Sequence, residues 1–270
     1  MLKKYLLMTL MIFCIATNAN AQTAEEYQSQ ISACTEEINI DKKNASLYIK
    51  RADIYVKLYE IDSENKENKK ALQNARKDYT KAIHLDKKSA EAYFKRGMIY
   101  NLSKEIETRG EAYDDFSKVI KLSPNNADYE AAYVGRAKVC YAEYVDANFD
   151  AMINHDRVLT DSLLKLLHDS VDDLTKAIEF NPNNWEYYYN RGKLHYALND
   201  YQSTAKDYSN AIELNPNELI IYLDRAKTFE KLQQYNEALA DYNKILQADY
   251  RVAFIETEAQ AGRERISKLI

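Results

Sequence analysis

Residues 188–195, YYNRGKLH, show a pattern that occurs five times along the chain. Each copy has a tyrosine, an arginine three residues later, a glycine or alanine four residues later, and a tyrosine, histidine, cysteine or phenylalanine seven residues later. The copies are YIKRADIY (48–55), YFKRGMIY (93–100), YVGRAKVC (133–140), YYNRGKLH (188–195) and YLDRAKTF (222–229). Positions 0, 3, 4 and 7 lie on one face of an α-helix, so the pattern predicts five amphipathic helices.

A second amphipathic segment follows each copy, so the repeating unit is predicted to be a pair of antiparallel helices. Pro124, Pro182 and Pro216 are the three prolines of the chain, and each follows such a segment where a proline ends a helix. Only 5 of the 270 residues are glycine, which disfavours a loop-rich or β-rich fold. The second segments are DYTKAIHLD (78–86), DFSKVIKLSP (115–124), DLTKAIEFNP (173–182), DYSNAIELNP (207–216) and DYNKILQAD (241–249).

The repeating unit resembles the tetratricopeptide repeat. Tyr188 and Tyr222 are 34 residues apart, and the last unit has an alanine, Ala238, sixteen residues after its first tyrosine. The resemblance covers nearly all of residues 25–250. It implies an all-α fold, a right-handed α-solenoid of antiparallel helix pairs with about five repeats.

Some positions depart from the family pattern. The units that begin at Tyr48, Tyr93 and Tyr133 are longer than 34 residues. Thr204 replaces an expected alanine, and Tyr250 replaces the proline of the last unit. These departures change the predicted loops and leave the predicted fold intact.

The largest insertion lies in the third unit and is predicted to form an elongated helical hairpin at about 142–170. Apolar residues continue at helical spacing on both of its sides, and its turn is expected near Asn154 to Arg157. Thr160 is expected to cap the second arm. The apolar seam suggests a contact site, although packing of the two arms against each other explains it more simply.

Both ends of the repeat array are predicted to be closed by single helices, because the end units of a solenoid would otherwise expose apolar faces. Residues 27–43 match the second helix of a unit without its first, and residues 257–270 read as a C-terminal capping helix. Residues 22–270 are therefore expected to form a single domain. Cys34 and Cys140 occupy apolar positions and are expected to be buried without a disulfide.

The arginine of each unit is matched by an aspartate at a constant place in the second helix, although the number of residues between them varies. We therefore expect a ladder of Arg–Asp pairs that ties helices together, with each arginine stem packed on tyrosines. The sequence leaves open whether a pair lies within a unit or between neighbours. The alternative is that each arginine reaches water. The predicted pairs are Arg51 and Asp78, Arg96 and Asp115, Arg136 and Asp173, Arg191 and Asp207, and Arg225 and Asp241.

A further stripe of the first helices, one, five and eight residues past each tyrosine, is the candidate binding surface. In the family that the repeats resemble, this stripe lines a concave groove that holds a peptide or helix of a partner protein. Its apolar and lysine residues suit an extended or helical segment of acidic character. The alternative is that they only contact neighbouring helices. The predicted groove residues are Phe94, Met98, Lys138, Tyr141, Tyr189, Lys193, Tyr196 and Lys227.

Recognition of a terminal carboxylate, which some members of the family achieve with a lysine, asparagine and arginine set, is not predicted. Ile49, Asp53, Gly135 and Asp224 stand at or beside the places that such a set would need. The alternative function is a structural one, in which the chain self-associates as a homo-oligomeric component of a cell-envelope assembly.

The N-terminal residues predict export. Lys3 and Lys4 precede an apolar run, and Ala19-Asn20-Ala21 completes the order of a secretory signal peptide, so residues 1–21 are expected to be removed after Ala21. The run is too short to span a bilayer, so no transmembrane segment is expected. A lipoprotein signal ending at Cys14 is the alternative, which the bulky Phe13 disfavours. The expected location is periplasmic or extracellular, in a secreted bacterial protein.

The composition and motifs favour a non-enzymatic protein. The net charge of −5 gives no basic surplus for nucleic-acid binding. No phosphate-binding glycine loop, nucleophile elbow or zinc-helix motif occurs, so no catalytic residue or cofactor is expected. His155 and His168 are placed at the tip and base of the predicted hairpin, which is poor geometry for a shared metal, and no metal site is predicted.

Overall fold

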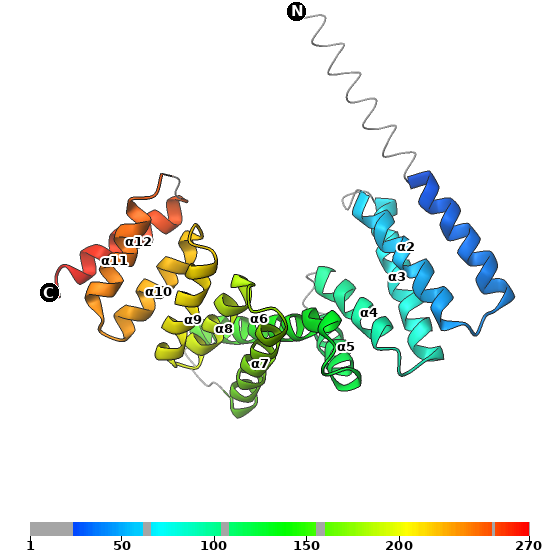
Figure 1. The fold of residues 1–270 in the computed structure, drawn as a ribbon, viewed down its shortest axis with the longest axis horizontal. Helices are drawn as coiled ribbons and strands as arrows, with labels where there is room; N and C mark the ends of the chain where they lie inside the picture. Colours follow the sequence, from blue (N-terminus) through cyan, green and yellow to red (C-terminus); the bar gives the residue numbers. More distant parts are fainter. Residues whose placement is uncertain (1–23, 62–65, 104–107, 155–159, 250–251, 270) are drawn as a thin grey trace, which may run out of the picture. The chain divides into compact units, whose positions relative to one another are not determined.

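A computed structural model describes residues 24–61, 66–103, 108–154, 160–249 and 252–269 (Figure 1). Every regular element within these ranges is a helix, and consecutive helices pack in pairs, which confirms the predicted all-α fold of helix pairs. The chain divides into two compact units, Met1–Pro124 and Asn125–Ile270. The single domain over 22–270 stays a prediction.

The first unit begins with a helix over residues 24–40, which is followed by two helix pairs. The first pair is α2 (Ala45–Ile61) with α3 (Lys66–Leu85), and the second is α4 (Ala90–Ser103) with α5 (Arg109–Leu122). The opening helix buries Ile31 and Cys34 in a cluster with residues of α2 and α3, as expected of the second helix of a repeat.

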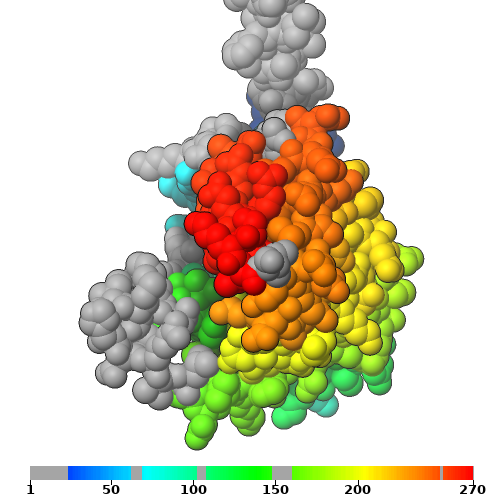
Figure 2. All heavy atoms as spheres, turned by 90° about the vertical axis from the view of Figure 1, so that its left-hand side faces the viewer, coloured from blue at the N-terminus to red at the C-terminus, as the bar shows by residue number. Residues whose placement is uncertain are grey.

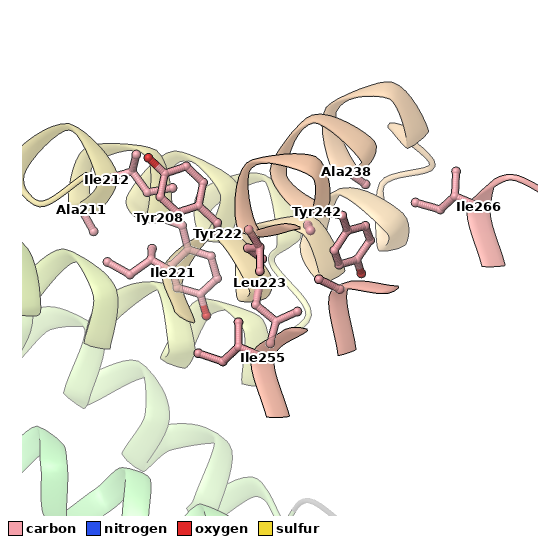
Figure 3. Close-up of a cluster of buried hydrophobic side chains, with 13 residues drawn as sticks. Tyr208, Ala211, Ile212, Ile221, Tyr222, Leu223, Ala238, Tyr242, Ile255 and Ile266 are labelled. Carbon is pink, nitrogen blue, oxygen red and sulfur yellow. The ribbon is translucent and has the colours of Figure 1, made fainter. Parts of the chain in front are cut away.

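The second unit contains three helix pairs and a closing helix, α12 (Ala253–Ile266). A short 3-10 helix, η2 (Ala127–Tyr129), precedes the first pair. Figure 2 shows α12 lying along the last pair, and Figure 3 shows one apolar cluster to which α9, α10, α11 and α12 contribute. The predicted capping helix is confirmed. The pairs are α6 (Glu130–Asn154) with α7 (Asp161–Phe180), α8 (Trp185–Ala197) with α9 (Tyr201–Leu214), and α10 (Leu219–Lys231) with α11 (Tyr235–Leu246).

The helices α6 and α7 are the arms of the predicted hairpin. They are 25 and 20 residues long, and the hydroxyl of Thr160 accepts a hydrogen bond from the backbone N–H of Leu163, which confirms the predicted cap. The predicted turn near Asn154 to Arg157 reaches into residues 155–159, which lie outside the described residues, as does His155. The contact role of the hairpin stays a prediction.

The two repeats of regular length each join their two helices by a tight turn. Asn199 between α8 and α9 and Gln233 between α10 and α11 have φ angles of 61° and 60°. This left-handed conformation ends the first helix abruptly, and asparagine adopts it more readily than glutamine. The second helix therefore begins within a few residues and packs directly against the first.

Glycine in the first helix allows close approach of the second. A methyl group added at Gly192 would lie 2.5 Å from Cε1 of Tyr208, and one added at Gly97 would lie 2.9 Å from Cε1 of Phe116. Tyr208 and Phe116 are buried, so these rings have little room to move. Both glycines are therefore sites of close helix packing.

We expect Gly192→Ala to lower the free energy of unfolding of the second unit by about 1–3 kcal/mol, because the added methyl group forces the Tyr208 ring out of its place. Urea denaturation followed by circular dichroism measures the change. Gly110→Ala is the matched control, since nothing lies within 4 Å of the added atom there, and it should be neutral or slightly stabilising. Equal stability of the two variants would contradict the packing argument.

Candidate partner-binding site on the second unit

The structure brings each predicted arginine to its predicted aspartate. In every pair the arginine Nε and Nη2 donate to the two carboxylate oxygens at 2.6–2.8 Å. The aspartates are buried and the arginines are only partly exposed. Every pair joins the first helix of a repeat to the second helix of the same repeat, which answers the question that the sequence left open.

The third guanidinium nitrogen, Nη1, donates a hydrogen bond to a hydroxyl group of the preceding repeat. Arg191 Nη1 donates to the Thr175 hydroxyl at 3.0 Å, and Arg225 Nη1 donates to the Ser209 hydroxyl at 2.9 Å. The Thr175 hydroxyl in turn donates to the backbone carbonyl of Val171. The sequence analysis missed these hydroxyl residues, although a threonine or serine occurs two residues after several of the aspartates. The corresponding contacts in the first unit join Arg51 to Thr35 and Arg96 to Thr80.

Burial and pairing act in opposite directions on the ladder carboxylates. Burial raises the pKa of Asp173 and Asp241, and the hydrogen bonds and positive charges of Arg136 and Arg225 oppose that rise. The guanidinium groups of Arg191 and Arg225 also lie over tyrosine rings. That of Arg191 is 5.8 Å from the ring centre of Tyr188. The ladder residues are thus engaged mainly with one another within the fold.

Two adjacent cavities lie over the first helices α6, α8 and α10. We call the first the tyrosine cavity: it has a volume of about 220 Å³ and is lined by Tyr141, Lys193, Tyr196, Tyr208, Asp224 and Lys227. We call the second the lysine cavity: it has a volume of about 250 Å³ and is lined by Ala137, Lys138, Tyr141, Leu174, Asn190, Lys193 and Leu194. Five of the predicted groove residues therefore line these two cavities.

Lys193 and Tyr141 line both cavities and stand between them. The Lys193 ammonium lies 4.3 Å from the ring centre of Tyr141 and 5.5 Å from that of Tyr189. Burial lowers the pKa of Lys193, which the negative charge of Asp224 opposes and the positive charge of Lys138 reinforces. Burial also raises the pKa of Tyr141 to about 12, so its ring stays neutral and can hold the cation.

Two residues of the tyrosine cavity were not among the predicted groove residues. Asp224 accepts a hydrogen bond from the Tyr189 hydroxyl at 2.8 Å, and burial raises the pKa of this carboxyl. Tyr208 comes from the second helix α9, and its ring packs against Tyr189 with the ring centres 5.6 Å apart. The signal for Asp224 was its place beside the predicted stripe. Tyr208 carries the apolar spacing of a core position and is buried, so the spacing gives no sign that its ring also lines a cavity.

Lys227 lines the tyrosine cavity but is already paired. Its ammonium lies 2.8 Å from Oε2 of Glu258 on the closing helix α12, and the Lys227 and Glu258 side chains are 35% and 39% exposed. Glu230 on α10 is held by Arg265 of the same closing helix at 2.7 Å. The closing helix therefore supplies a charge to the edge of the candidate site, which the sequence pattern did not indicate.

Phe94 and Met98 lie on α4 in the first unit and are partly exposed. Their place relative to the two cavities is not defined, so their participation in one groove stays a prediction. The first unit has its own tyrosine, aspartate and lysine arrangement, in which Asp53 accepts hydrogen bonds from the Tyr79 hydroxyl at 2.6 Å and the Lys95 ammonium at 2.7 Å.

Three apolar residues of the predicted stripe are buried. Each is at most 8% exposed and stands at the first position of the stripe in its repeat: Ile49, Val134 and Leu223. They contact neighbouring helices and belong to the core, as the alternative interpretation of the stripe holds. The surface open to a partner is consequently narrower than the full stripe, and in the second unit it is concentrated around α8.

Comparisons with known proteins agree with this architecture. Residues 185–218 and 220–251 each match a family model described as tetratricopeptide repeat. The structure is similar to that of YrrB, described as a tetratricopeptide-repeat protein with an unusual peptide-binding site. The TM-score is 0.63, the identity is 20%, and the match covers 86% of this chain and 98% of that one.

Two MamA structures are also similar. For MamA from Desulfovibrio magneticus RS-1 the TM-score is 0.51 at 16% identity, covering 72% of this chain and 94% of that one. For MamA AMB-1 the TM-score is 0.56 at 14% identity, covering 80% and 98%. A comparison with curated proteins found no match. Residues 185–218 and 220–251 are therefore tetratricopeptide repeats, within a chain whose fold is that of known tetratricopeptide-repeat structures.

Proposed function

We propose that the protein is a non-enzymatic scaffold that binds a segment of a partner protein over the first helices of its second unit. The observation that carries this proposal is the pair of adjacent cavities to which α6, α8 and α10 contribute. Each cavity is smaller than the about 300–1,000 Å³ typical of small-molecule sites. Their size suits single side chains of a bound segment, and the similar protein YrrB is described as having a peptide-binding site.

The chemistry of the two cavities supports an acidic or partly acidic segment. Tyrosine rings offer large, rigid contact area, which is typical of residues that dominate binding energy. Lys138 and Lys193 supply positive charge beside these rings, so a negatively charged segment would be attracted electrostatically.

The two free cysteines that the structure describes and His195 have structural surroundings. Burial raises the pKa of Cys140 to about 11, which disfavours the nucleophilic thiolate, and Cys34 and Cys140 are both free and buried. Burial lowers the pKa of His195, which lies between Asp200 and Asp207 in the repeat packing. Within the described ranges no group of three or more histidine, cysteine, aspartate or glutamate residues is arranged to hold a metal ion.

A displayed random peptide library tests the proposal. We expect the full chain to enrich peptides whose binding weakens about tenfold or more, which is about 1.4 kcal/mol, in Tyr141→Ala and in Lys193→Ala. Lys206→Ala is the matched control, because Lys206 is an exposed lysine of α9 outside both cavities. Affinities are measured by fluorescence anisotropy. A chain that enriches no peptide, or peptides that bind both cavity variants as well as the control, would contradict segment binding.

Self-association is the second candidate function. The exposed apolar residues near the C-terminal end favour it, since Phe254 is 62% and Leu269 is 60% exposed. A homo-oligomer detected by light scattering, and lost in Phe254→Ser, would support a structural role. A monomer at high protein concentration would contradict it.

Export to the periplasm or the extracellular space is part of the proposal. It rests on the order of residues in 1–21, which lie outside the described residues. None of the helices in the described part of the chain has the length and apolarity that a membrane crossing requires. N-terminal sequencing of the protein produced with its first residues intact should begin at Gln22, and an intact Met1 would contradict cleavage.

A further inference from the structure

The two cavities differ in charge. Lys138 and Lys193 are the charged residues that line the lysine cavity in the described part of the chain, and no carboxylate lines it there. Lys138 is exposed, and no ion pair of its side chain is seen among the described residues. The cavity therefore presents two positive charges above walls made by Ala137, Leu174 and Leu194.

The tyrosine cavity is electrostatically balanced by the protein itself. Lys227 is paired with Glu258 at 2.8 Å, so its charge is neutralised from the closing helix. Asp224 accepts a hydrogen bond from Tyr189 and lies near Lys193. The remaining lining consists of the rings of Tyr141, Tyr196 and Tyr208. A carboxylate entering this cavity would lose hydration and would meet Lys227 already paired with Glu258 and Lys193 already close to the negative charge of Asp224.

We infer that the site binds two side chains of a partner segment, a carboxylate in the lysine cavity and an uncharged side chain in the tyrosine cavity. Glu258 determines this difference between the two cavities. The inference rests on the proposed segment binding and adds which kind of side chain each cavity accepts. Glu258 acts on the specificity of the site through Lys227, without lining either cavity.

The shape of the lysine cavity favours a carboxylate on an aliphatic stem, such as glutamate. The apolar walls of Ala137, Leu174 and Leu194 would contact the methylene groups, while Lys138 and Lys193 would contact the carboxylate. Lys193 is held over the Tyr141 ring before any partner arrives, so little side-chain freedom is lost on binding. This pre-positioning makes the acidic contact specific instead of a general attraction to the surface.

The role of Glu258 follows from its exposure and its helix. The ion pair with Lys227 is partly exposed, so it contributes little to stability and can be removed without unfolding α12. The closing helix is held independently by Arg265 with Glu230 and by its buried face, which includes Ile255 and Ala259. Glu258→Gln should therefore free the positive charge of Lys227 while the fold of the closing helix is retained.

Peptide selection on variants of the full chain tests this rule. The same displayed random library is selected on the wild type, on Lys138→Gln and on Glu258→Gln, and the enriched peptides are sequenced. The wild type should enrich peptides with one acidic position and a separate uncharged position. Lys138→Gln should weaken the preference for the acidic residue, and Glu258→Gln should convert the uncharged position to an acidic one, with about tenfold tighter binding of peptides that are acidic at both positions.

Each outcome separates the inference from the proposal on which it rests. Peptides that bind through Tyr141 yet show no acidic preference, or the same sequences enriched by the wild type and Glu258→Gln, would overturn the charge rule alone. Failure of the wild type to enrich any peptide would overturn segment binding and the rule together. Glu264→Gln, at an exposed position of the same helix, is the control. It should enrich the same peptides as the wild type, because the ion pair of Lys227 with Glu258 stays in place.

Discussion

Replacing Arg191 with alanine is expected to lower the free energy of unfolding of the second unit by about 3–5 kcal/mol. Asp207 is 3% exposed and accepts both of its hydrogen bonds from Arg191, so the substitution leaves a buried carboxylate without its partner. Arg191 also donates to Thr175 in the preceding helix pair, so contacts within and between repeats are lost together. Urea denaturation of the variant and the wild type measures the change.

Two further variants separate the causes of that loss. Arg191→Lys keeps the charge but cannot donate to both carboxylate oxygens in parallel, so its stability should fall between those of Arg191→Ala and the wild type. Lys206→Ala removes an exposed charge from the same unit and should change stability by less than about 0.5 kcal/mol. An Arg191→Ala variant as stable as the Lys206→Ala variant would show that the ladder contributes nothing.

Tyr242→Ala is expected to lower the free energy of unfolding of the second unit by about 3–5 kcal/mol, because it opens a cavity beneath the closing helix. The Tyr242 side chain is fully buried, and its ring lies so close to Gly262 of α12 that an added methyl group there would be 2.2 Å from the ring. Its hydroxyl donates to Glu230, which Arg265 of α12 also holds. Figure 3 shows Tyr242 among the side chains of this cluster.

The location of the damage distinguishes this variant from a general loss of stability. Hydrogen exchange should show faster exchange in α12 than in α8 and α9 when Tyr242 is truncated, because each helix pair contacts only its neighbours. Tyr242→Phe keeps the ring and removes only the hydroxyl bond, so its loss should be smaller, about 1–3 kcal/mol. Exchange that rises evenly over the whole unit would contradict the role of Tyr242 in docking the closing helix.

Much of the local structure follows from the sequence because its causes are local. Apolar spacing along each segment predicts the helices, Thr160 caps α7, and the proline positions mark helix ends. Constant register identified the Arg–Asp pairs even where insertions separate them, since a repeating unit places equivalent residues in equivalent surroundings.

The candidate site was only partly predictable. Lys138, Tyr141, Lys193, Tyr196 and Lys227 were identified from the stripe, and each lines a cavity. The contribution of Tyr208 was not identified, because a periodicity that marks a core position does not indicate that a buried ring also lines a cavity. Ile49, Val134 and Leu223 followed the stripe but are buried, because the packing of neighbouring helices decides how much of each helix face is covered.

The sequence by itself determined the helix pairs, their closing helices and the residue types available to each face, because helical periodicity and repeat register are properties of consecutive residues. Only the tertiary structure decided which charged side chains already have a partner within the protein. Lys227 and Lys193 look alike along the chain, yet Lys227 is neutralised by Glu258 from a different element and Lys193 is held over Tyr141. Such pairings depend on distances between side chains far apart in the chain, which no spacing along a single helix contains.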